Sequence, residues 1–94
     1  GENVIINTGA TIDHDCVIED YVHISPGVHL AGNVKLGELS HIGIGASAVQ
    51  RVKIGKGVII GAGAVVIDDI PDHVTAVGVP ARVIKRHGEG AELA

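Results

Sequence analysis

Aromatic side chains are almost absent from this 94-residue sequence, of which only 1% is Phe, Trp or Tyr. Phe, Trp and Met do not occur at all, and the only residue of the Phe, Trp and Tyr group is Tyr21. Apolar residues nevertheless make up 46% of the chain, and Gly occurs 14 times. The core must therefore be filled by Val, Ile, Leu and Ala, a composition that favours short β-strands and tight turns over packed helices.

Other scarcities exclude further classes of protein. No run of about 18 apolar residues occurs, so we expect no transmembrane helix and no membrane partner. Seven Lys and Arg against 11 Asp and Glu give a net charge of −4, which argues against nucleic-acid binding. The single cysteine, Cys16, can form no internal disulfide; this is typical of a reducing compartment and predicts a cytoplasmic protein.

Apolar residues recur at every sixth position through most of the chain. Every sixth residue from Ile6 to Val66 is apolar, and the residues two positions earlier, from Val4 to Ala64, are all small or β-branched. A period of six matches neither the 3.6 of an α-helix nor the 3.5 of a coiled coil. It is typical of a parallel β-helix, in which each hexad forms one short strand and one turn.

Three such hexads close a triangular coil with the large residues inside, so residues 18 apart in the sequence stack one strand spacing apart, about 4.8 Å. We therefore predict an all-β fold, a parallel β-helix of about four coils over residues 1–71. Pro71 and Pro80 interrupt the repeat, so residues 72–94 are expected to form a closing loop or strand and a frayed tail of the same domain.

A short solenoid buries little surface on its own, so we expect a homotrimer with flat faces packed around a three-fold axis. The scaffold also accounts for most Gly, Ile and Val residues. One of these segments, Gly43 to Ala48, is similar to a dinucleotide fingerprint, but its glycines follow the repeat. Cys16 falls on a small inward position, which favours packing over chemistry.

Four histidines within 28 residues depart from the repeat and are candidates for proton transfer near neutral pH: His14, His23, His29 and His41. His14 precedes Gly32 by 18 residues, so the Gly32 N–H should lie about 4.8 Å from the level of His14. A candidate base then lies beside a candidate oxyanion donor. Asp13 and Asp15 flank His14, and a carboxylate bonded to an imidazole raises its basicity.

The segment from Ile12 to Gly27, IDHDCVIEDYVHISPG, resembles the left-handed β-helix acyltransferases that N-acetylate nucleotide-linked amino sugars or O-acetylate sialic acid. The later segment from Gly78 to Arg82, GVPAR, is similar to the closing motif of hexapeptide acetyltransferases. The resemblance covers residues 3 to about 86. It implies a left-handed coil, acetyl-CoA as acyl donor, a small-molecule sugar acceptor, and direct transfer to an amine or hydroxyl without an enzyme nucleophile.

The resemblance also implies roles for individual residues. His14 would be the general base that takes the proton of the sugar amine or hydroxyl, and Asp15 the acid that orients it or raises its basicity. His23 would lie near the thioester end of acetyl-CoA. The Gly32 amide would hold the thioester carbonyl as negative charge develops.

The pantetheine arm would lie in a groove between neighbouring subunits, beside Ile44 and Ala62. These two residues form one column with Pro26 by the 18-residue spacing, and His14, Gly32 and Gln50 form another. If the two columns face each other across a trimer interface, each site needs two chains. Candidates for the CoA phosphates, with solvated surface charge as the alternative, are Arg82, Lys85 and Arg86.

Members of this family usually carry an N-terminal α/β domain that binds the nucleotide-sugar. Because the sequence begins at the β-helix, we expect it to correspond to the C-terminal domain alone, either as a fragment or as a reduced form. The acceptor is then less well defined than the donor.

Two other functions on the same fold remain open. A zinc enzyme of the γ-carbonic anhydrase type would need two His five residues apart and a third two coils away. The nearest pair, His23 and His29, is six apart and no His pair is 36 apart, so no metal site is expected. The other alternative is a non-catalytic trimeric scaffold, which does not need a histidine flanked by carboxylates.

Overall fold

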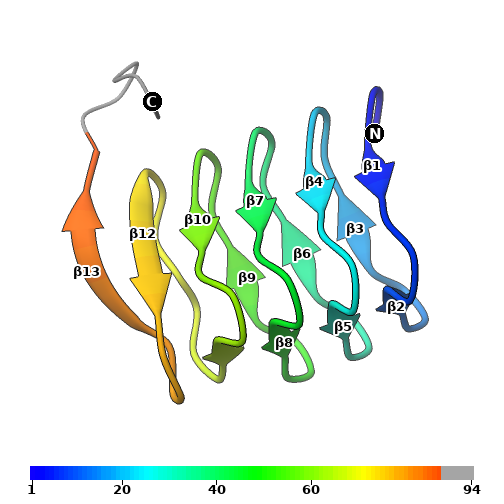
Figure 1. Ribbon diagram of the computed structural model, residues 1–94. Helices are drawn as coiled ribbons and strands as arrows, with labels where there is room; N and C mark the ends of the chain where they lie inside the picture. The colour runs from blue at the N-terminus through cyan, green and yellow to red at the C-terminus, as the bar shows by residue number, and fades with distance from the viewer. Residues whose placement is uncertain (88–94) are drawn as a thin grey trace.

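The structure, a computed structural model, describes residues 1–87. This part of the chain contains β-strands and no helix (Figure 1). Two-residue strands recur every six residues: β1 (Ile5–Ile6), β2 (Thr11–Ile12), β3 (Val17–Ile18), β4 (His23–Ile24), β5 (His29–Leu30), β6 (Lys35–Leu36), β7 (His41–Ile42), β8 (Ser47–Ala48), β9 (Lys53–Ile54), β10 (Ile59–Ile60) and β11 (Val65–Val66). Two longer strands follow them, β12 (Val74–Val77) and β13 (Arg82–Arg86).

The short strands stack into three parallel sheets that form the faces of a prism (Figure 1). The six-stranded sheet has the order β1-β4-β7-β10-β12-β13, the four-stranded sheet β11-β8-β5-β2, and the three-stranded sheet β3-β6-β9. Partners within β1 to β11 are 18 residues apart, as for His23 with Ile5 on one side and His41 on the other. The predicted fold class, a left-handed parallel β-helix of about four coils with a short closing segment, is confirmed.

Within each hexad, residues that point into the prism alternate with residues that point outward. From the second coil onward both the large and the small positions of the repeat are buried; Ile24, Leu36 and Val58 are fully inaccessible. Ile6 in the first coil is 51% exposed because it has a neighbouring coil on one side only. Cys16 packs partly against this core, and its Sγ donates to the Ala31 carbonyl at 3.2 Å.

Each turn between β1 and β11 has one residue in the left-handed region of φ, and these residues recur every sixth position from Gly9 to Gly63. Glycine occupies many of these sites, because it has no Cβ to oppose a positive φ; Gly27 is an example, with φ 73°. Non-glycine residues occupy others, including Asp15 with φ 58°. Asn and Asp tolerate this conformation better than most residues.

The repeat ends near Pro71, yet parallel pairing continues beyond it. β12 pairs with β10, and β13 then returns antiparallel to β12, so a hairpin covers one end of the six-stranded sheet. The first four residues of the GVPAR segment, Gly78 to Ala81, connect these two strands, and its last residue, Arg82, begins β13. His87 is tied to the hairpin by its N–H, which donates to the His73 carbonyl at 2.6 Å. The expected frayed tail lies, beyond residue 87, outside the described residues.

Within residues 1–87, no helix is long and apolar enough to span a bilayer.

Candidate active site

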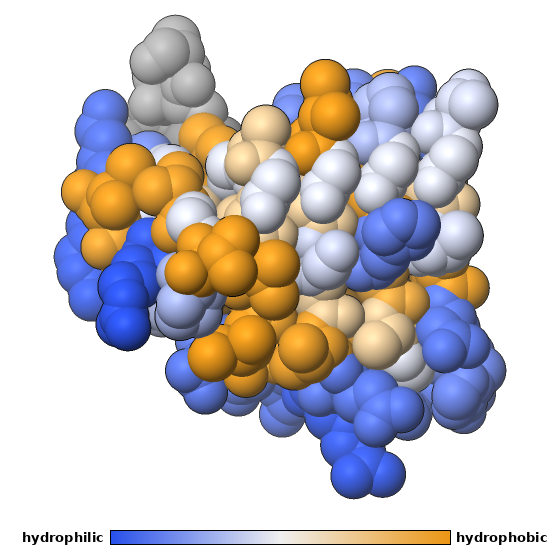
Figure 2. Space-filling view, turned by 60° about the horizontal axis from the view of Figure 1, so that its bottom comes forward, coloured by the Kyte–Doolittle hydropathy of each residue, from blue (hydrophilic) through white to orange (hydrophobic). Residues whose placement is uncertain are grey.

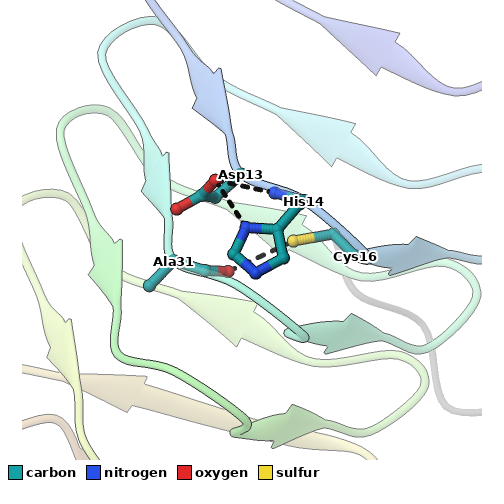
Figure 3. Close-up of polar contacts among 4 residues, drawn as sticks. All are labelled: Asp13, His14, Cys16 and Ala31. Atoms are coloured by element: carbon teal, nitrogen blue, oxygen red, sulfur yellow. Dashed lines mark hydrogen bonds and ion pairs between the residues drawn. The ribbon is translucent and has the colours of Figure 1, made fainter.

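His14 lies in the turn between β2 and β3, where the preceding residue holds its imidazole (Figure 3). Its Nδ1 lies 3.0 Å from Oδ1 of Asp13, and its backbone N–H donates to the same oxygen at 2.7 Å. Because a carboxylate only accepts hydrogen bonds, the ring proton belongs on Nδ1, and Nε2 is the free basic nitrogen. The His14 side chain is 64% exposed, so Nε2 is open to an incoming acceptor.

Gly32 lies against the His14 ring from the next coil. The N–H of Asn33 donates to the His14 carbonyl at 3.1 Å, which holds the two turns one above the other. A Cβ added to Gly32 would lie 2.9 Å from Cε1 and 3.1 Å from Nε2 of His14, so only glycine leaves the ring in place. Gly32 is buried, and within residues 1–87 its N–H has no hydrogen-bond partner. A residue that packs against the base and has an unpaired N–H is a candidate donor to a developing oxyanion.

Asp13, rather than Asp15, makes the direct contact with the His14 ring. Hydrogen bonding to Asp13 is the main cause that raises the pKa of His14 above its ordinary value, and the charge of Asp13 adds to it. The charge of Asp15 contributes least to the rise. The same hydrogen bond lowers the pKa of Asp13. The family resemblance implies Asp15 as the acid that orients His14 or raises its basicity; that role stays a prediction, beside the contact that the structure gives to Asp13.

Pro26, Ile44 and Ala62 stack at another corner of the prism, between the six-stranded and four-stranded sheets. The N–H of Gly45 donates to the Pro26 carbonyl at 3.0 Å, and that of Gly63 to the Ile44 carbonyl at 2.8 Å. All three stacked residues are exposed, and Ile44 is 63% exposed although it is a large apolar residue. We call these three residues the Ile44 column.

The Ile44 column and the His14 turn lie at opposite edges of the four-stranded face. In each coil a strand of that sheet separates the two corners; β5, for example, lies between Pro26 and Gly32. The two corners therefore cannot face each other within one chain. A site that uses both of them must be completed by a second chain.

The remaining sequence candidates lie elsewhere on the prism. His23 and His41 are neighbours on the outer side of the six-stranded sheet, where their rings stack with centroids 4.5 Å apart and planes 10° from parallel. His29 lies on the four-stranded face, where its Nδ1 is 2.5 Å from Thr11 Oγ1. The basic candidates for the CoA phosphates are exposed along β13: Arg82, Lys85 and Arg86.

A groove of about 660 Å³ runs over the four-stranded face between the two corners, and Asp13, His29 and Gln50 are among the residues that line it. Figure 2 shows apolar side chains gathered on one side of the molecule, toward its C-terminal coils. Exposed large apolar residues include Ile44, Val49, Ile67 and Val79. Among residues 1–87, no group of three or more His, Cys, Asp or Glu is arranged to hold a metal ion.

Comparison with known proteins bears on the family of this fold. Residues 1–32 match the family described as bacterial transferase hexapeptide (six repeats). The resemblance to the hexapeptide-repeat acyltransferases inferred from the sequence is confirmed.

Solved structures of two bacterial proteins are similar to this chain. The acetyltransferase domain of PglB from Neisseria gonorrhoeae, in complex with acetyl coenzyme A, is 54% identical with a TM-score of 0.85, over 86% of this chain and 40% of that one. PerB from Caulobacter crescentus, in complex with CoA and GDP-perosamine, is 48% identical with a TM-score of 0.86, over 86% of this chain and 39% of that one.

A serine acetyltransferase in complex with cysteine is more distant, at 33% identity with a TM-score of 0.87, over 94% of this chain and 38% of that one. The chain thus spans about two fifths of the length of the relatives that it matches.

Proposed function

We propose that this chain is the acetyl-transfer part of an acetyl-CoA-dependent sugar acetyltransferase, with His14 as general base. The observation that carries the proposal is the packing of the Asp13-bound His14 ring against Gly32, whose N–H has no hydrogen-bond partner within residues 1–87. The relatives that contain CoA or acetyl-CoA support the donor, and the one that contains GDP-perosamine supports a nucleotide-linked amino sugar as acceptor.

The transfer is direct. Nε2 of His14 takes a proton from the acceptor amine, whose nitrogen forms a bond to the thioester carbonyl carbon. Negative charge collects on the carbonyl oxygen, which the Gly32 N–H binds. The C–S bond then breaks, and the CoA thiolate leaves with the proton that His14 acquired. His23 lies near the thioester and the Ile44 column beside the pantetheine arm.

We further propose that the chain acts as a homotrimer in the cytoplasm. The separation of the Ile44 column from His14 on one face supports a site shared between two chains. Exposure of apolar residues such as Ile44 and Ile67 supports burial against another copy. The single free cysteine is consistent with a reducing compartment.

Calorimetric titration of the purified chain with acetyl-CoA, with its mass in solution recorded alongside, tests the proposed function. We expect a trimer that binds acetyl-CoA at micromolar strength, near one site per chain. Ile44→Asp should abolish this binding, whereas Val17→Asp, on the three-stranded face and away from the Ile44 column, should preserve it. A well-formed trimer that binds no acetyl-CoA would favour the scaffold instead.

The pH dependence of the reaction should separate the two carboxylates. A raised pKa keeps His14 protonated, and so inactive as a base, up to a higher pH. Asp13→Asn removes the main cause of that rise, so the acidic limb of kcat should move to lower pH, with a lower plateau because the base is weaker.

Asp15→Asn is the matched control, since Asn also tolerates a positive φ, and it should move the limb little. Initial rates between about pH 5 and 9 measure the acidic limb of kcat in both variants. If the limb moves as far in Asp15→Asn as in Asp13→Asn, or further, the orienting role belongs to Asp15.

A further inference from the structure

The His23 ring is held from two sides by residues that have no role in the site so far. From the first coil, Nδ2 of Asn7 lies 3.2 Å from His23 Nε2. From the third coil, the His41 ring stacks on the ring of His23. Both contacts follow from the stacking of coils, which places β1, β4 and β7 side by side in the six-stranded sheet (Figure 1).

The orientation of the Asn7 amide is fixed by its second contact. Its Nδ2 also lies 3.2 Å from the Ile24 carbonyl oxygen, and the backbone N–H of Asn7 donates to that same oxygen at 2.9 Å. The reverse orientation of the amide would set two acceptor oxygens against each other. Asn7 therefore has its NH₂ group between the Ile24 carbonyl and the His23 ring, and donates to both.

This contact determines which nitrogen of His23 carries the proton. A nitrogen that accepts a hydrogen bond has no hydrogen of its own, so Nε2 is unprotonated and the neutral ring has its proton on Nδ1. Within residues 1–87, Nδ1 of His23 has no hydrogen-bond partner, so its N–H is available to a ligand. On the other side, burial and then the charge of the nearby His23 lower the pKa of His41, which favours the uncharged form of the ring that stacks on His23.

We propose that Asn7 and His41 are positioning residues that hold His23 as a neutral ring with its proton on Nδ1, available to donate a hydrogen bond to the acyl carbonyl of the donor. The inference rests on the proposed function for the identity of the ligand. Asn7 sets the tautomer and His41 sets the plane of the ring, and neither contacts the reacting atoms.

Long-range ¹H–¹⁵N NMR of the uniformly labelled full chain at about pH 8, above the ordinary His pKa of about 6.5, tests the tautomer without any ligand. The ¹⁵N shifts of His23 should mark Nδ1 as protonated and Nε2 as unprotonated. Asn7→Asp puts an acceptor in place of the donor, so the proton should move to Nε2. The signals of His29, which is bonded to Thr11 on another face, should not change. A wild-type proton on Nε2, or no change in Asn7→Asp, would overturn the inference.

Steady-state kinetics then test the consequence for the donor. Asn7→Asp and His41→Ala should each raise the KM for acetyl-CoA about tenfold, the effect of one lost hydrogen bond, with a smaller change in kcat. His41→Phe keeps a stacked ring and should restore the wild-type KM. Unchanged KM in His41→Ala, or no rescue by His41→Phe, would overturn the role of His41. Failure of the wild-type chain to bind acetyl-CoA, with the proton on Nδ1, would instead overturn the proposed function and the ligand with it.

Discussion

Replacing His14 by alanine should lower kcat for acetyl transfer by about 10²- to 10⁴-fold, the usual contribution of a positioned general base. The variant loses Nε2, the nitrogen that takes the acceptor proton, while the groups assigned to the donor are unchanged. Initial rates with acetyl-CoA and a nucleotide-linked amino sugar measure the loss. The His14 side chain is 64% exposed, so its removal should leave the melting temperature nearly unchanged.

Acetyl-CoA binding provides the control for this variant. Because binding is assigned to the Ile44 column and His23, the affinity measured by calorimetry should stay within a few-fold of wild type. A His14→Ala chain that remains active would exclude His14 as the base. A chain that loses both activity and binding would place His14 in the donor site rather than at the acceptor.

Gly32→Ala should lower kcat by a factor comparable to that of His14→Ala, for a steric reason. The added methyl would lie 2.9 Å from Cε1 of His14, closer than carbon atoms pack, so the imidazole must move away from Gly32. The base and the oxyanion donor are then separated, and we expect kcat to fall by about 10²- to 10³-fold, as when an oxyanion-hole donor is removed. Rates under saturating acetyl-CoA measure the effect.

Thermal unfolding distinguishes this local displacement from a general loss of structure. Gly32 does not have a positive φ, and the atoms that its new methyl would meet belong to an exposed side chain, so the melting temperature should change little. In the double variant His14→Ala, Gly32→Ala the added methyl has no ring to displace. Its activity should equal that of His14→Ala alone, and a further loss would indicate that the methyl acts elsewhere in the chain.

The sequence predicted the solenoid well because its signal is periodic. The same six-residue spacing that made Ile24 and Leu36 inward positions also fixed the 18-residue register, and therefore the meeting of His14 with Gly32. The hexad pattern by itself does not separate the exposed Ile6 from the buried inward residues, since the repeat treats every coil alike while an outer coil has one neighbour. The β12–β13 hairpin was foreseen only as a closing loop or strand because it lies outside the repeat.

Contacts that do not follow the 18-residue register could not be derived from spacing. Asp13 and Asp15 are equally near His14 in sequence, and only the turn geometry selects Asp13 for the ring. Asn7 reaches His23 across 16 residues, because its side chain extends from a turn rather than from a matched strand position. The stacked position of His41 was predictable from the register, although its effect on His23 was not.

The 18-residue register makes the site unusually sensitive to one kind of change and tolerant of another. Deleting one residue between Cys16 and Ala31 would bring Asn33, in place of glycine, to the level of His14, and its side chain would meet the imidazole. Duplicating a whole coil after Ile54 would lengthen the prism by one strand spacing, about 4.8 Å, and leave His14 and Gly32 as they are. Length variation that preserves such a site should therefore come in multiples of a full coil, or as loops that bulge outward from a corner.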